Sequence, residues 1–133
     1  MADATITLVG NITRDPEIRF LDSGTATAKF SIAVTRKWKN KQGEQNEQTS
    51  FFDCSALGTI AENIQNSLRK GDRAIVTGTL EQRSYDDKEG NKRSVTEVKV
   101  EACGPDLRWA TAQTNRSTPA SFYAAKSTVE EAW

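Results

Sequence analysis

Residues 25–38 alternate apolar and polar side chains along almost their whole length. Successive side chains of a β-strand point to opposite faces of the sheet, so this pattern predicts one long strand with one face toward a core. The predicted buried face contains Ala28, Phe30, Ile32 and Val34. The chain is therefore expected to fold around a β-sheet.

Other strand-like segments flank this one, and residues typical of turns separate them. The first covers residues 5–9 and meets Gly10, where a bend or bulge is expected. Polar, glycine-containing stretches at 39–47 and 86–91 are typical of exposed hairpin loops. The remaining predicted strands cover residues 17–20, 48–57, 73–85 and 93–102.

One helix is predicted after the strand that ends at residue 57. Thr59 with Glu62 three residues later is a capping-box pattern, with Thr59 as the N-cap. Gly71 occupies the position expected for the C-terminal cap. Apolar residues at a spacing of four form a stripe that would face the core, namely Ile60, Ile64 and Leu68.

The order of these elements indicates the fold class. Three strands, one helix and two more strands is the order of an all-β OB-fold, a five-stranded Greek-key barrel with one helix between strands 3 and 4. Other small β-barrels share this order. A chain of 133 residues suits one such domain. Composition changes after Trp109, so we expect an OB-fold domain at 1–109 and a flexible C-terminal tail at 110–133.

Composition excludes several classes of function. The chain has no histidine, which excludes His-dependent triads, His acid–base catalysis and His-ligated zinc. Its two cysteines, Cys54 and Cys103, form no CxxC motif and are expected to be reduced thiols that pack in the domain. We predict no enzyme activity, no metal and no cofactor. The lack of a long apolar segment or signal peptide predicts a cytoplasmic protein without membrane contact.

Aromatic residues beside cations form the candidate site. Trp38 lies in a basic stretch, Tyr85 lies near three basic residues, and Phe51 and Leu57 share the mixed face of their strand. Single-stranded nucleic acid stacks its bases on such rings, at roughly 1–3 kcal/mol per base, while cations follow its phosphates. Each ring also fits a structural role at the core edge, and a one-residue register slip would bury Phe51. The nearby cations are Arg36, Lys37, Lys39, Lys41, Arg83, Lys92 and Arg93.

Several segments resemble the bacterial single-stranded-DNA-binding proteins of the tetrameric kind. The most specific is residues 6–20, ITLVGNITRDPEIRF. The others follow in the same order and at matching spacing: FSIAV at 30–34 with Trp38, LRKG at 68–71, and VTG at 76–78 through Tyr85 to TEV at 96–98.

The resemblance implies an OB-fold homotetramer that binds and protects single-stranded DNA without sequence preference, in replication, recombination and repair. It implies no catalysis. Bases would stack on Trp38, Phe51 and Tyr85, and Leu57 stands at a fourth stacking position that is often phenylalanine. The basic positions that match the family are Arg19, Lys41, Lys70, Arg83 and Arg93.

The C-terminus departs from the family pattern, which commonly ends in an acidic tip that recruits replication and repair proteins. Here the last residues include Glu130, Glu131 and Trp133, which either replace that tip or have no role. Recruitment of such partners is therefore expected to be weaker, and the protein is expected in the cytoplasm with the nucleoid. Two alternatives remain at this stage: a protein-interaction OB module of the primosome type, and an RNA-binding OB domain.

Overall fold

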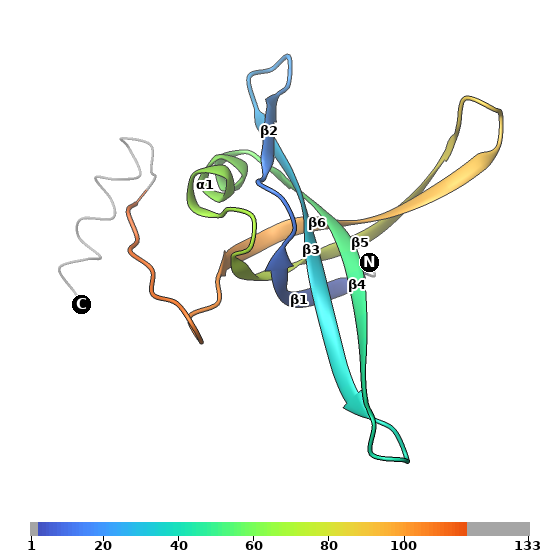
Figure 1. Ribbon diagram of the computed structural model, residues 1–133. Helices are drawn as coiled ribbons and strands as arrows, with labels where there is room; N and C mark the ends of the chain where they lie inside the picture. Colours follow the sequence, from blue (N-terminus) through green and yellow to red (C-terminus); the bar gives the residue numbers. More distant parts are fainter. Residues whose placement is uncertain (1–2, 117–133) are drawn as a thin grey trace.

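Strands dominate the computed structural model, which describes residues 3–116 of the chain (Figure 1). The predicted short run at 17–20 forms a sixth strand beside the five main ones. No helix within 3–116 is long and apolar enough to cross a membrane. The elements in chain order are β1 (Thr5–Ile12), β2 (Glu17–Phe20), β3 (Ala26–Lys39), β4 (Gln45–Leu57), α1 (Thr59–Ser67), β5 (Arg73–Asp86) and β6 (Lys92–Pro105).

The strands form one closed sheet in the order β1-β5-β6-β4-β3-β2. The barrel closes because the end of β1 also pairs with β3, at Asn11 opposite Ala33. Neighbouring strands are antiparallel except β4 and β6, which run parallel. With α1 between β4 and β5, this is the topology of the OB-fold, so the predicted fold class is confirmed.

The core contains the predicted inward face of β3. Ala28, Phe30 and Ile32 are buried, while Val34 is only partly buried where the strand leaves the barrel. From α1, Ala61 and Ile64 cover one end of this core. Burial on one face of each element is the main stabilising contribution in a domain of this size.

The two cysteines are free thiols, as predicted. Cys54 is buried in the core, and Cys103 is partly buried against it. Burial, with a smaller contribution from Cys103, raises the pKa of Cys54 to about 12, and burial raises the pKa of Cys103 to about 11. Both side chains therefore act as protonated packing groups at neutral pH.

Gly10 does not form the predicted bend or bulge. Strand β1 continues through it to Ile12, and a Cβ atom at Gly10 would lie 2.2 Å from the carbonyl oxygen of Ala33. The glycine is needed for close approach to β3 and not for a turn. The irregularity lies elsewhere, between Thr77 and Gly78 of β5, where the register with β6 shifts.

The predicted caps of α1 are also wrong. The N-cap is Gly58, at φ 88°, and no side chain caps the helix. Thr59 is instead the first helical residue, because the chain turns sharply from β4 through a left-handed conformation that glycine adopts readily. The helix ends at Ser67, so Gly71 lies beyond the cap, in a turn where its N–H donates to the Ile12 carbonyl at 2.7 Å.

The two hairpins are longer than predicted. Strands β3 and β4 stay paired to Lys39 opposite Gln45, so the loop at 39–47 shrinks to the five residues 40–44. Strands β5 and β6 stay paired to Asp86 opposite Lys92. Both hairpins extend beyond the barrel as ribbons, one downward and one to the upper right in Figure 1.

An ion pair between Arg73 and Asp106 lies where the chain leaves the barrel after β6. Asp106 is buried, and Arg73 donates to its carboxylate at 2.8 Å. The backbone N–H of Arg108 and then the Arg73 guanidinium lower the pKa of Asp106. The guanidinium groups of Arg73 and Arg108 lie 4.8 and 5.0 Å from the centroid of the Trp109 ring. Residues 110–116 contain no helix or strand, and residues 117–133 of the predicted tail lie outside the described part.

Candidate nucleic-acid interface

Three of the four predicted stacking residues lie on the outer face of the barrel strands. Phe51 and Leu57 of β4 are 69% and 61% exposed, and Tyr85 of β5 is 52% exposed. On β4 the adjacent residues Phe52 and Ala56 face the core, so the register is the predicted one and Phe51 is not a core residue. Large apolar side chains that share an exposed face indicate a contact surface.

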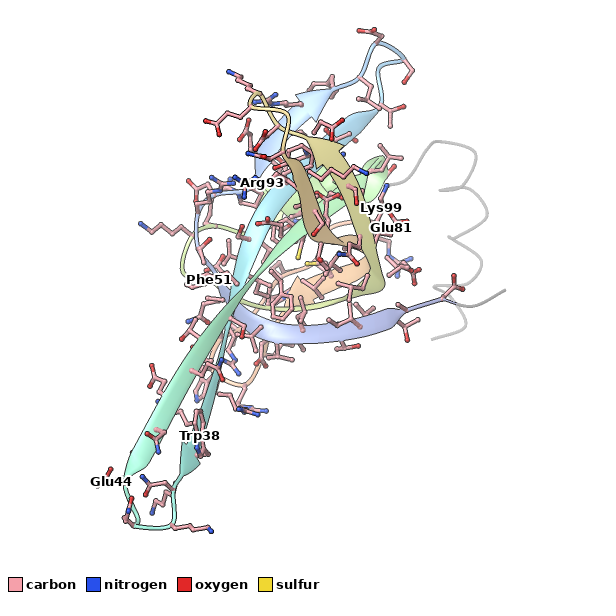
Figure 2. All side chains as sticks on the ribbon, turned by 90° about the vertical axis from the view of Figure 1, so that its right-hand side faces the viewer. Trp38, Glu44, Phe51, Glu81, Arg93 and Lys99 are labelled. Atoms are coloured by element: carbon pink, nitrogen blue, oxygen red, sulfur yellow. The ribbon has the colours of Figure 1, made fainter. Side chains whose placement is uncertain are left out.

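Trp38 lies on the other face of the β3–β4 ribbon. It is opposite Asn46, whereas Phe51 is opposite Ala33, an odd number of residues from Trp38 on β3. Side chains an odd number apart on a strand point to opposite faces. Figure 2 shows Trp38 far out along the ribbon and Phe51 near the barrel. Trp38 is 40% exposed, and the Arg36 guanidinium lies 4.9 Å from the centroid of its ring.

The predicted cations divide into paired and unpaired groups. Exposed ion pairs are weak, so a phosphate can displace the carboxylate from such a cation. The pairs are Arg19 with Glu17 at 2.7 Å, Lys37 with Glu47 at 3.9 Å and Arg93 with Asp87 at 3.0 Å. Within residues 3–116, no ion pair is formed by Arg36, Lys39, Lys41, Lys70, Arg83 or Lys92.

The unpaired cations are distributed around the aromatic residues and do not form one cluster. Lys39 and Lys41 lie at the tip of the β3–β4 ribbon, and Lys92 begins β6 at the base of the other tip. Lys70 lies on neither ribbon but in the turn after α1, where its N–H donates to the Asp15 carboxylate at 2.8 Å. The structure therefore places cations along both ribbons, with Lys70 as the outlier.

A row of carboxylates crosses the middle of the outer face. Asp53 of β4 is in register with Glu97 of β6, and Glu97 is opposite Glu81 of β5. Ser31 donates to the Asp53 carboxylate at 2.7 Å. Glu81 is ion-paired with Lys99 at 3.7 Å, whereas Asp53 and Glu97 form no ion pair within residues 3–116. Since these two carboxylates repel phosphates, their part of the face suits bases better than the phosphate backbone.

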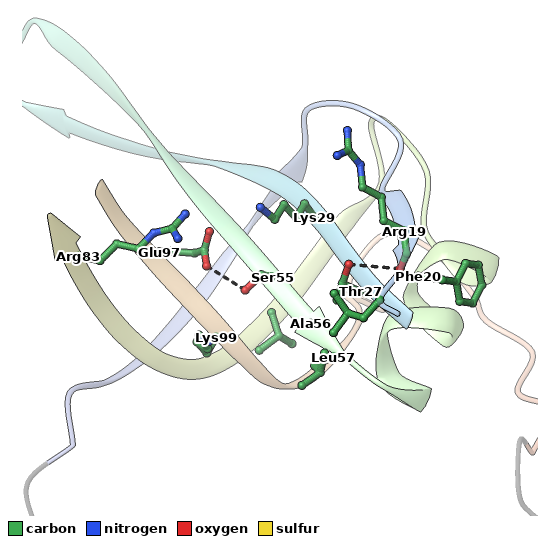
Figure 3. A pocket seen from close by; sticks show the side chains of 12 residues that line it. Arg19, Phe20, Thr27, Lys29, Ser55, Ala56, Leu57, Arg83, Glu97 and Lys99 are labelled. Carbon is green, nitrogen blue, oxygen red and sulfur yellow. Dashed lines mark hydrogen bonds between the residues drawn. The ribbon is translucent and has the colours of Figure 1, made fainter. Parts of the chain in front are cut away.

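A cavity of about 460 Å³ opens beside Leu57, and Figure 3 shows the side chains around it. Ala56 and Val100 supply apolar lining. Ser55 Oγ donates to Glu97 Oε1 at 3.1 Å, and a dashed line joins these two residues in Figure 3. The cations that line the cavity are Arg19, Lys29, Arg83 and Lys99.

Sequence reasoning did not select Lys29, Lys99 or Glu97 as site residues. The alternation of β3 and β6 places all three on the polar side of their strands, which is the signal that could have identified them. That signal alone does not bring them together. Their proximity depends on the parallel pairing of β4 with β6, where Ser55 is opposite Lys99.

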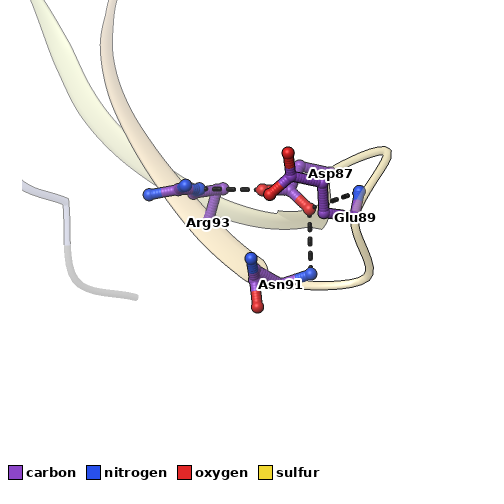
Figure 4. A network of polar contacts seen from close by, with 4 residues as sticks. All are labelled: Asp87, Glu89, Asn91 and Arg93. Atoms are coloured by element: carbon purple, nitrogen blue, oxygen red, sulfur yellow. Dashed lines mark hydrogen bonds and ion pairs between the residues drawn. The ribbon is translucent and has the colours of Figure 1, made fainter.

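Asp87 organises the tip of the β5–β6 ribbon (Figure 4). Its carboxylate accepts hydrogen bonds from the backbone N–H groups of Glu89 at 3.0 Å and Asn91 at 2.8 Å, and from Arg93 Nε at 3.0 Å. The hydrogen bond from Arg93, followed by that from Asn91, lowers the pKa of Asp87. Arg93 is directly opposite Tyr85, so Asp87 holds a cation beside a predicted stacking residue.

Replacing Asp87 with asparagine is expected to lower the melting temperature at neutral pH. In acid the variant and the wild type should have the same melting temperature. A carboxyl group whose folded pKa lies below its unfolded value of 3.8 stabilises the fold above that value. The stabilisation disappears as the pH falls through the folded pKa. Thermal unfolding of both proteins from about pH 6 to about pH 2 measures this convergence.

Asp86→Asn is the control for that comparison. The Asp86 carboxylate accepts no hydrogen bond from residues 3–116, so its replacement should leave the melting temperature nearly unchanged at every pH. A gap between wild type and Asp87→Asn that stays constant down to pH 2 would contradict the assigned role of the charge.

Comparison with known proteins identifies the family. Residues 3–105 match the Single-strand binding protein family. The chain belongs to this family. It is 48% identical over 118 residues to the Single-stranded DNA-binding protein of Mycolicibacterium smegmatis, an alignment that covers 87% of this chain and 72% of that protein. The corresponding protein of Mycobacterium leprae is 47% identical over 118 residues, with 87% and 70% covered.

A solved structure agrees with the sequence relatives. The small single-stranded DNA-binding protein of Streptomyces coelicolor superposes with a TM-score of 0.69 and is 30% identical. The match covers 80% of this chain and 97% of that one. The family is one of binding proteins and not of enzymes, in agreement with the function class expected from composition.

Proposed function

We propose that this protein binds single-stranded DNA, coats it without requiring a particular sequence, and protects it during replication, recombination and repair. The observation that carries the proposal is the exposure of Phe51, Leu57 and Tyr85 on the outer face of an OB barrel in this family. Unpaired bases expose flat faces that such side chains can contact, whereas a duplex hides them.

The charge distribution supports a defined arrangement of the strand. Bases lie over the middle of the outer face, because the carboxylates of Asp53 and Glu97, which form no ion pair within residues 3–116, repel phosphates there. Phosphates follow the margins and the ribbons, where cations are available. The Trp38 ring, beside Arg36, contacts the strand where it passes the other face of the β3–β4 ribbon.

Assembly into a homotetramer is part of the proposal. Along residues 5–9, β1 pairs with β5 on one side, and pairing with β3 is confined to Asn11 and Ile12. This leaves an unpaired strand edge, which proteins commonly cover by association. Ile75, opposite Val9 on β5, is 41% exposed and adds apolar surface beside that edge.

The remaining parts of the proposal concern location and the chain ends. We place the protein in the cytoplasm with the nucleoid, and the DNA-binding domain at residues 1–109. The predicted flexible tail begins at residue 110, and its residues 117–133 lie outside the described part of the chain. Its proposed partner-binding residues, Glu130, Glu131 and Trp133, lie outside the described residues and stay a prediction.

Titration with oligo-dT tests the proposal through tryptophan fluorescence. We expect strong quenching at low salt, a stoichiometric endpoint, and an affinity that falls as salt rises because phosphate binding releases counterions. Duplex DNA should not quench. The variant Trp38→Phe keeps a ring for stacking and should retain binding, measured with a labelled oligonucleotide, while losing most of the quenching.

Two outcomes would redirect the assignment. Tighter binding of oligo-rU than of oligo-dU would favour an RNA-binding OB domain. Absence of binding to any single strand at low salt would contradict the proposed function and favour a protein-interaction module.

A further inference from the structure

Beyond Phe51, the outer face of the β3–β4 ribbon offers no further ring to a nucleic-acid strand. The next cross-strand pair on that face is Thr35 with Thr49, whose hydroxyl oxygens lie 3.0 Å apart. The pair after it is Lys37 with Glu47, an ion pair at 3.9 Å. A strand that stacks on Phe51 therefore meets hydroxyl groups and an ion pair farther along the same face, and no aromatic side chain.

Trp38 is accessible only from the opposite face of this ribbon (Figure 2). It lies five residues along β3 from Ala33, the residue opposite Phe51, which is about 17 Å at roughly 3.4 Å per residue. A strand bound to the outer face of one subunit would have to cross the free edge of that subunit's own ribbon to reach the Trp38 ring.

The Trp38 face of the ribbon continues the core-facing side of β3. Ile32 is buried in the barrel, Val34 is half-buried where the ribbon leaves it, and Trp38 follows in the same alternation. β1 closes the barrel on this side, because its last two residues pair with β3 while residues 5–9 pair with β5. Among the described residues, the other edge of β1 at 5–9 has no partner strand. That open edge therefore diverges from β3 on the side that the Trp38 ring faces.

A groove of about 290 Å³ lies at the base of the same face. Val34 and Phe52, both half-buried, supply its apolar lining. Val34 directly follows Ala33, a residue that pairs with β1, so the groove adjoins the open β1 edge. The polar residues around it are Arg36, Gln48 and Ser50. A second copy of the chain that covers the β1 edge, as in the proposed homotetramer, therefore lies against the Trp38 face.

We infer that Trp38 completes the binding surface of a neighbouring subunit, so that the strand stacked on the outer face of one copy reaches the Trp38 ring of the next. The Arg36 guanidinium, 4.9 Å from the centroid of that ring, supplies a cation for a phosphate of the same strand. This role of Trp38 rests on the proposed function, including the homotetramer, and deepens it, because the site of each subunit is incomplete without a second copy.

Mixed oligomers test this role by complementation. One parent subunit carries Phe51→Ala with Tyr85→Ala and keeps Trp38, and the other carries Trp38→Ala and keeps the outer face. Each parent alone should bind a short oligo-dT at least about fivefold more weakly than wild type at low salt, because each lacks at least one stacked base. Co-expression with two affinity tags and purification over both yields oligomers that contain both subunits.

We expect these mixed oligomers to bind oligo-dT about fivefold more tightly than the tighter parent, because unlike neighbours can assemble an intact surface. The labelled strand is kept at low concentration, so that intact surfaces are occupied first. If Trp38 served its own subunit, every subunit of the mixture would be defective. An affinity no better than that of the tighter parent would therefore overturn the inference and leave the proposed function standing.

The matched control co-expresses the double-variant subunit with one that carries Trp38→Ala in addition, so no subunit offers an intact outer face. These oligomers should bind no more tightly than the double variant, and a gain equal to that of the test mixture would overturn the inference. Trp38→Leu keeps an apolar side chain without a stacking face and is the second form of the Trp38 parent, with melting temperatures recorded for both.

The homotetramer and the DNA-binding function are checked separately in the same experiment. Subunits that elute only as monomers in size-exclusion chromatography would overturn the homotetramer and the shared site together. Failure of the wild type to bind oligo-dT would overturn the proposed function itself.

Discussion

Replacing Phe51 and Tyr85 together with alanine is expected to weaken oligo-dT binding by roughly 2–6 kcal/mol per site, the sum of two stacked bases at 1–3 kcal/mol each. Both residues are more than half exposed, so their loss removes contact surface for the bases and little core packing. Anisotropy of a labelled oligonucleotide at low salt gives the dissociation constants. Circular dichroism and thermal unfolding should be close to wild type.

Leu107→Ala is the control for this variant. Leu107 is 62% exposed and lies beyond the end of β6, away from the proposed strand path. Its loss should leave oligo-dT binding unchanged. If the double variant bound oligo-dT as tightly as wild type, the outer face of β4 and β5 would not be the binding surface. The binding surface would then be the other face of the β3–β4 ribbon, where Trp38 lies.

Gly78→Ala is expected to lower the free energy of unfolding by about 3 kcal/mol or more, at the upper end of what overpacking costs. A Cβ atom at Gly78 would lie 2.0 Å from the carbonyl oxygen of Lys99 and 2.8 Å from its carbonyl carbon. These are backbone atoms of the paired strand β6, so no side-chain rotation relieves the overlap. Denaturant unfolding at a fixed protein concentration measures the change.

Gly104→Ala separates this clash from the general effect of replacing a strand glycine. Gly104 also lies in the β5–β6 pair, opposite Ile75, but a Cβ atom there meets nothing within 4 Å. Its replacement should be neutral or slightly stabilising, because alanine restricts the unfolded chain. Similar losses in the two variants would contradict the assigned cause. Since Gly78 adjoins the register shift of β5, we also expect its replacement to disturb the position of Glu97 and the cavity.

Local patterns predicted much of the fold because they depend on short-range geometry. The alternation in β3 and β4 identified which side chains face the core, and the structure buries Phe30 and Cys54 while exposing Phe51. The same reasoning failed at the helix start. A capping-box pattern at Thr59 and Glu62 was outweighed by Gly58, whose left-handed backbone conformation makes the turn from β4.

The sequence by itself determined the strand faces, the element order, the absence of histidine chemistry and the resemblance to a family. Tertiary structure alone decided which of the candidate residues share a surface. It placed Trp38 and Phe51 on opposite faces of the β3–β4 ribbon. It also brought Ser55 into hydrogen-bonding distance of Glu97 through the parallel pairing of β4 with β6, which are far apart in the chain. The physical reason is that the alternation of apolar and polar residues shows on which face of a strand a side chain lies. Which side chains of other strands lie beside it depends on how the strands pair when the barrel closes.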